Sequence, residues 1–209
     1  MKLDNLKAHK FVIFFMVLVE LDLLLINKLG ILIKTQWVAF LVELFLYILL
    51  VILPIFIYLQ YKEKSILDYL KLRTNAKAGI VQGLILALIL SIFALIRMKM
   101  TLTRFKTISV YNFSGIVLVG FFEEIPFRGF FLQIIEEHYG FWIGNVVTSI
   151  IFGIMHLPLW YLSKGNIISS FTSVFIFSII QGFIFRESKS LWTVIIFHSF
   201  YDLILSVIF

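Results

Sequence analysis

The sequence contains no cysteine in its 209 residues. Disulfide bonds and catalysis by a thiol nucleophile are therefore both excluded. Charged residues are also scarce, at 14% against the roughly 25% of soluble domains, whereas hydrophobic residues reach 61%. With a mean hydropathy of +1.04, this composition is that of an integral membrane protein.

The net charge of +6 does not come from a basic domain. The lysines and arginines lie mostly in short polar connections, such as those at 61–78 and 98–113. Charged loops beside membrane spans explain this distribution better than nucleic-acid binding, so no nucleic-acid partner is expected. Lys2, Lys7 and Lys10 favour an N-terminus on the inner side of the membrane.

Seven stretches are predicted as membrane-spanning helices, since a span needs about 20 mostly apolar residues. They cover residues 11–33, 37–60, 79–97, 114–135, 141–162, 167–185 and 191–208. Charged residues interrupt the first stretch, so an eighth span within it is an alternative. No small-residue cleavage site follows that stretch, so it is expected to be retained. The sequence shows no repeat and no linker, and therefore predicts an all-α fold: one integral membrane domain over residues 1–209, a polytopic transmembrane bundle of seven or eight spans.

Ionisable residues inside spans are costly and usually face the bundle interior or a wet cavity. Glu20, Asp22 and Glu43 lie in the first two spans, with no recognisable pattern around them. Near span ends, or paired with Lys28 or a neighbouring lysine, such residues are structural charges. We therefore assign them no chemical role.

The fourth span carries the stretch "GFFEEIPFRG" at 120–129. Glu124 and Arg128 are four residues apart and share a helix face, so we expect them to neutralise each other as an ion pair. Glu123 points to another side of the helix and is expected to face a different partner. Pro126 favours a kink, because it removes a backbone donor. A purely structural ion pair is the alternative, but it leaves the burial of Glu123 unexplained.

Two later spans supply histidines. His156 lies in "FGIMHLP", where Pro158 is expected to end or kink the helix just after it. His198 and Asp202 lie four residues apart in "FHSFYD" and share a helix face. A lone histidine on an apolar face is more often a packing residue. A bundle can nevertheless project Glu123 and both histidines into one cavity.

A carboxylate and two imidazoles in a sheltered cavity suit the activation of water. Glu123 is the candidate general base, and His156 is a candidate to hold the same water. His198 is a candidate to stabilise a tetrahedral oxyanion, with Asp202 orienting it or donating beside it. Glu123, His156 and His198 also match a two-histidine, one-glutamate zinc site, so a metal enzyme and a metal-free enzyme both stay open. Neither HExxH nor GxSxG is present, and Ser199 projects to another side of the helix than His198.

The stretches "EEIPFRG", "FGIMH" and "HSFYD" resemble the EExxxR, FxxxH and HxxxN or HxxxD motifs of the CPBP intramembrane proteases, the CAAX-processing and bacteriocin-processing (Abi) family. The resemblance covers residues 110–209. It implies a catalytic set made of Glu123, Glu124, Arg128, His156, His198 and Asp202. Many members carry Asn at the last position. An ionised Asp202 cannot donate a hydrogen bond, which leaves orientation of His198 as its other role.

The resemblance implies an intramembrane endopeptidase in the cell membrane, with a membrane-associated peptide or protein as substrate. Its cofactor is open between zinc and none. The composition, rich in Ile, Phe and Lys, is compatible with a low-GC bacterium. A non-catalytic scaffold or bacteriocin-immunity protein of the same fold is a second class. A proton-relaying transporter is a third, although the order of the motifs argues against it.

Overall fold

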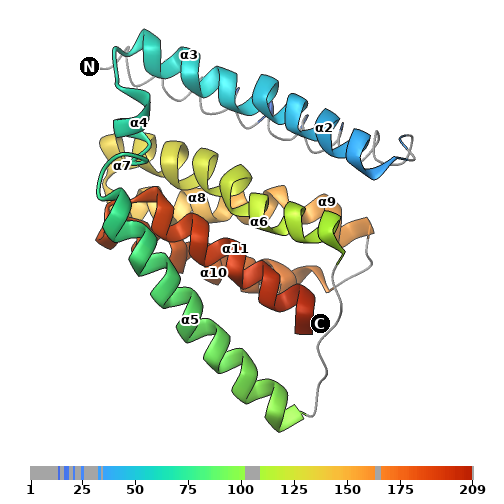
Figure 1. Ribbon diagram of the computed structural model, residues 1–209. Helices are drawn as coiled ribbons and strands as arrows, with labels where there is room; N and C mark the ends of the chain where they lie inside the picture. The colour runs from blue at the N-terminus through green and yellow to red at the C-terminus, as the bar shows by residue number, and fades with distance from the viewer. Residues whose placement is uncertain are drawn as a thin grey trace. The chain divides into compact units, whose positions relative to one another are not determined.

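The computed structural model describes residues 35–101, 109–162 and 166–208, with isolated positions between 14 and 33 (Figure 1). The residues it describes form helices and turns, with no strand among them. The predicted all-α class is therefore confirmed. Glu20, Asp22 and Lys28 of the first predicted span lie outside the described residues.

The helices follow one another with short connections, and two of them, marked η, are π-helical. In chain order they are α2 (Gln36–Tyr47), η1 (Ile48–Ile52), α3 (Leu53–Tyr61), α4 (Ile66–Tyr69), α5 (Ala76–Thr101), α6 (Val110–Glu124), η2 (Ile125–Leu132), α7 (Gln133–Tyr139), α8 (Phe141–Met155), α9 (Leu157–Leu162), α10 (Ile167–Ser188) and α11 (Leu191–Ile208).

Four helical segments in the described part of the chain are long and apolar enough to cross a membrane. They are Gln36–Tyr61, Ala76–Arg97, Phe141–Tyr161 and Ile167–Ser188. They match four of the predicted spans closely, and the apolar helix Leu191–Val207 matches the last one at a shorter length. A helical membrane bundle is thus confirmed, with the number of spans agreeing approximately.

The predicted fourth span changes its helix type where its charges lie. The sequence suggests α-helical spacing through this stretch, with a kink at Pro126, but Ile125–Leu132 is π-helical. A π-helix bonds residues five apart, and such segments within α-helices are frequent at functional sites. Pro126 has no N–H to donate to the preceding turn, which favours a departure from the α-helical pattern here.

The described residues divide into two compact units, each assembled from both halves of the sequence. The first unit consists of Met1–Ile66 and Pro126–Phe183, and the second of Leu67–Ile125 and Ile184–Phe209. The single domain expected over residues 1–209 stays a prediction. The motif residues are distributed over both units.

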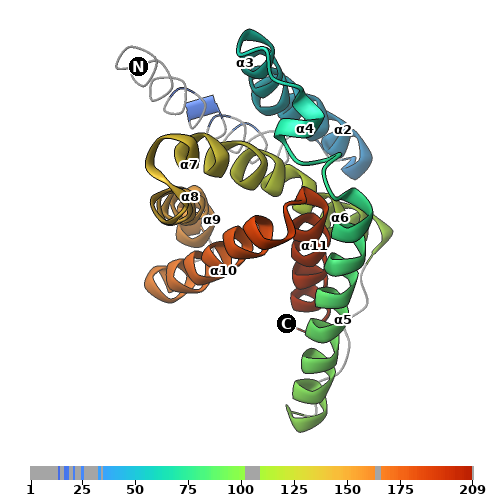
Figure 2. The same cartoon turned by 90° about the vertical axis from the view of Figure 1, so that its left-hand side faces the viewer.

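In the first unit, α7 and α8 lie side by side, joined by a turn at Gly140 (Figure 2). Gly140 has a φ of 80°, which glycine adopts without a steric cost. The helix α8 also contacts α10, where Asn145 Nδ2 donates to the carbonyl oxygen of Ile179 at 3.1 Å. The core of this unit is apolar and rich in aromatic rings. Its buried side chains include Leu59, Phe130, Phe131 and Phe152.

In the second unit, α11 lies between α5 and α6 (Figure 1). A Cβ atom added at Gly83 of α5 would come within 3.0 Å of the Thr193 carbonyl oxygen, so the two backbones are close. Thr193 Oγ1 donates to the Gly79 carbonyl oxygen at 3.1 Å. Small residues four apart allow this kind of close helix packing in membranes. The helix α11, which carries His198 and Asp202, is thereby enclosed on two sides.

Candidate active site

The motif residues fall into two groups, one in each unit. Glu123 and Glu124 end α6, and His198 and Asp202 lie in α11, so these four belong to the second unit. Arg128 in η2 and His156, which directly follows α8, belong to the first unit. The expected Glu124–Arg128 ion pair and the convergence of His156 with Glu123 link the two units, and both stay predictions.

In the second unit, three carboxylates surround the ring of His198. Glu124 Oε1 lies 2.6 Å from Nδ1. On the other side of the ring, Glu123 Oε2 lies 3.7 Å and Asp202 Oδ2 lies 3.6 Å from Nε2. Charges inside an apolar helix are costly, so a cluster of this kind indicates a functional site.

Exposure separates the roles of these carboxylates. The side chain of Glu124 is completely buried and that of His198 is 4% exposed, whereas those of Glu123 and Asp202 are 28% and 30% exposed. Glu124 is therefore a buried support for the ring. Glu123 and Asp202 lie where the ring meets accessible space.

The geometry gives the two ring nitrogens of His198 different partners. With Glu124 ionised, Nδ1 is the donor of their hydrogen bond, because a carboxylate only accepts. This bond holds the ring so that Nε2 faces Glu123 and Asp202. The sequence suggests Asp202 as the residue that orients His198, but the short hydrogen bond comes from Glu124. The sequence could not reveal this contact, because it joins residues 74 positions apart.

In the first unit, Phe152 lies between Arg128 and His156. The Arg128 guanidinium carbon is 4.8 Å from the centre of the Phe152 ring, and the His156 ring centre is 4.7 Å from it. His156 Nδ1 also contacts the Phe152 carbonyl oxygen at 2.7 Å. The phenylalanine of the stretch "FGIMH" therefore contacts both motif residues of this unit, Arg128 and His156.

Two partners in the first unit were not predicted from the sequence. Arg128 donates to the Oγ of Ser178 at 2.8 Å and to its carbonyl oxygen at 3.1 Å. Trp160 stacks on the ring of His156, with the ring centres 5.7 Å apart. A serine or a tryptophan in an apolar span is too common to be singled out without the contact itself.

The sequence leaves a zinc ion open as a cofactor. Among the described side chains, no group of three His, Asp or Glu residues is arranged to hold a metal ion. The expected ligand set of Glu123, His156 and His198 extends over both units, so its fit stays a prediction.

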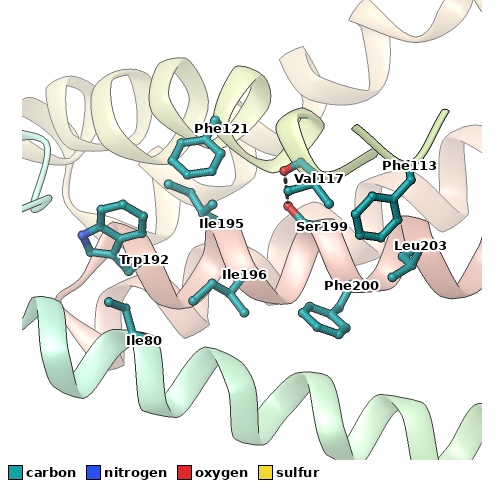
Figure 3. Close-up of a pocket in the computed structure, with 10 residues that line it drawn as sticks. All are labelled: Ile80, Phe113, Val117, Phe121, Trp192, Ile195, Ile196, Ser199, Phe200 and Leu203. Carbon is teal, nitrogen blue, oxygen red and sulfur yellow. Dashed lines mark hydrogen bonds between the residues drawn. The ribbon is translucent and has the colours of Figure 1, made fainter. Parts of the chain in front are cut away.

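An apolar groove of about 280 Å³ runs along another face of α11 (Figure 3). Its only polar side-chain atoms come from Trp192 and Ser199, and both donate hydrogen bonds to backbone oxygens, of Leu72 and Val117 respectively. The groove is lined by α5, α6 and α11, through Ile80, Phe113, Val117, Phe121, Trp192, Ile195, Ile196, Ser199, Phe200 and Leu203.

The comparisons with known proteins give a match for the second half of the chain. Residues 106–204 match the family model for type II CAAX prenyl endopeptidase, Rce1-like. No curated protein and no solved structure matches the chain. The match includes every motif residue, from Glu123 to Asp202. This match confirms the resemblance to the CAAX-processing proteases that was noted from the three motifs, over residues 106–204.

Proposed function

We propose that this protein is an intramembrane endopeptidase. It hydrolyses a peptide bond in a membrane-associated peptide or protein, using a water molecule activated by Glu123 and histidine. The observation that carries the proposal is the ring of His198, held by Glu124 at Nδ1 with Glu123 and Asp202 near Nε2. The family match supports protease chemistry.

In the proposed reaction, Glu123 accepts a proton from water as the water oxygen attacks the carbonyl carbon of the substrate. His156 orients that water: its Nδ1 contacts the Phe152 carbonyl oxygen, so Nε2 is the ring atom that accepts from the water. General base catalysis of this kind contributes about 10²–10⁴-fold to a rate.

The oxyanion that forms accepts a hydrogen bond from Nε2–H of protonated His198, while Nδ1–H remains hydrogen-bonded to Glu124. Asp202 orients the ring from the Nε2 side before substrate binds. When the intermediate collapses, Glu123 returns its proton to the leaving nitrogen and the C–N bond breaks. The products are a carboxylic acid and an amine, which exchange a proton to become a carboxylate and an ammonium group, so the step requires water alone. We place the protein in the cell membrane of a bacterium.

The test uses purified full-length protein in lipid vesicles and an internally quenched peptide with a prenylated CAAX end. Wild type is expected to cleave it, and Glu123→Gln is expected to lose about 10²–10⁴-fold in kcat. His156→Ala should lose activity likewise. Glu187→Gln is the matched control, because Glu187 is an exposed carboxylate of α10 and no motif residue.

Abundance and membrane insertion of all variants are measured beside cleavage. Full activity of Glu123→Gln would overturn the mechanism. If the biological role persists in both Glu123→Gln and His156→Ala, the protein acts as a scaffold or immunity protein of the same fold.

A further inference from the structure

A close approach of α6 and α11 occurs one helical turn from the Glu124–His198 hydrogen bond. Gly120 of α6 is buried against α11. A Cβ atom added there would lie 2.5 Å from the Ile195 carbonyl oxygen and would also overlap Ser199 Oγ. The Ile195 oxygen belongs to a helix backbone and cannot rotate away as a side chain can. Only glycine fits at this position with the helices as they are.

The two helices run antiparallel at this contact. Val117 lies against Ser199, Gly120 against Ile195, and Phe121 against Trp192, so numbers rise along α6 as they fall along α11. Cα–Cβ bonds of a helix tilt toward its N-terminus. In an antiparallel pair, the side chains of Glu124 and His198 therefore lean toward each other, back to the level of Gly120.

A hydrogen bond fixes the register of this contact. Ser199 Oγ donates to the Val117 carbonyl oxygen at 2.9 Å (Figure 3). It restricts sliding of α11 along α6, whereas Gly120 determines how close the two helix axes come. The close approach that Gly120 allows is the condition needed for a contact as short as the 2.6 Å between Glu124 and His198, and the Ser199 hydrogen bond adds to it.

We propose that Gly120 is a positioning residue of the active site. Because Gly120 has no side chain, the backbone of α11 can approach α6 closely enough for Glu124 to contact His198 Nδ1. This contact orients Nε2 toward Glu123 and Asp202. The part of this role that concerns the reaction rests on the proposed peptidase function. The part that concerns the Glu124–His198 hydrogen bond does not.

Gly120→Ala tests the proposal, and Gly115→Ala is the matched control. Both glycines lie in α6, and a Cβ atom added at Gly115 meets nothing within 4 Å. The readout that needs no substrate is NMR of histidine-labelled, full-length protein in micelles. It follows the hydrogen-bonded Nδ1–H proton of His198, assigned by its loss in His198→Gln.

The proton signal is expected in wild type and in Gly115→Ala, and to be lost or strongly shifted in Gly120→Ala. With the prenylated peptide, kcat of Gly120→Ala is expected to fall about 10²-fold, as for a misplacement of about 1 Å, with little change in KM. A Gly120→Ala variant that keeps both the signal and its kcat would overturn the proposal. If the signal changes as expected but wild type cleaves no peptide, the peptidase function fails and the positioning role stands.

If Gly120→Ala does not accumulate as folded protein, the double variant Gly120→Ala/Ser199→Ala takes its place. This variant removes the hydroxyl that overlaps the added methyl group, and Ser199→Ala alone is its reference. The signal is then expected in Ser199→Ala and to be lost in the double variant. Its retention in the double variant would likewise overturn the proposal.

Discussion

At the scale of single residues, the clearest result is that two neighbouring glutamates differ in their exposure and in the ring nitrogen that they approach. Glu124 is completely buried on His198 Nδ1, while Glu123 is partly exposed near Nε2. Adjacent positions of a helix point about 100° apart, so one side chain can support the ring while the other faces accessible space. The two glutamates of the stretch "EEIPFRG" thus occupy two different environments.

Two substitutions of Glu124 distinguish the effect of its hydrogen bond to His198 from the effect of its charge. Glu124→Ala leaves the imidazole of buried His198 without this acceptor, and we expect it to lower the free energy of unfolding by about 1–3 kcal/mol. Glu124→Gln retains an acceptor oxygen and should cost less. Thermal unfolding in detergent measures the difference, and both variants should cleave the peptide more slowly than wild type. Equal stability of wild type and Glu124→Ala would contradict this assignment.

At the scale of elements, the π-helix η2 connects two stretches of α-helix within the first motif. It carries Arg128, which is 1% exposed and donates twice to Ser178 of α10. The same guanidinium lies over the ring of Phe152 from α8. An irregular helix segment is therefore tied by one buried cation to two regular helices.

Ser178→Ala tests this connection. Because a hydrogen bond to a charged group contributes about 1.5–3 kcal/mol, we expect a loss of that size in the free energy of unfolding. Ser173→Ala is the control, since Ser173 is exposed on the same helix and its Oγ donates only to the Ser169 carbonyl oxygen. It should change stability by no more than about 0.5 kcal/mol. Equal effects of the two variants would show that Ser178 does not hold Arg128.

At the scale of the whole molecule, helices that expose apolar side chains along much of their length are the dominant feature. Leu88 and Phe93 of α5 are 61% and 67% exposed. In water such a surface would promote aggregation, whereas in a bilayer it contacts lipid of the same polarity. The segment Gln36–Tyr61 has 26 residues and so a length of about 39 Å, more than the roughly 30 Å of a hydrocarbon core.

Cysteine labelling tests this span directly, because the chain has no cysteine of its own. Thr35→Cys and Tyr61→Cys place a thiol at either end of the segment, at exposed positions. With a membrane-impermeant maleimide, the two are expected to react from opposite sides of oriented vesicles. Reaction of both from the same side would show that the segment does not cross.

The motifs show which contacts could be predicted from the sequence. The pair His198 and Asp202 could be read from the sequence, since a spacing of four residues places side chains on one helix face. The same rule suggested an ion pair of Glu124 and Arg128, which stays a prediction. The rule assumes an α-helix, whereas the chain is π-helical from Ile125 onward. The helix type depends on Pro126 and on the packing of this segment, which a spacing rule does not include.

The sequence by itself determined the helical class, the position of most spans and the residue types available for catalysis. These follow from the apolar length of each segment and from spacing along a single helix. Only the tertiary structure decided that Glu124 holds His198, that Ser178 holds Arg128, and that Gly120 admits α11. Such contacts depend on the distance and rotation between helices, which arise from packing among residues far apart in the chain.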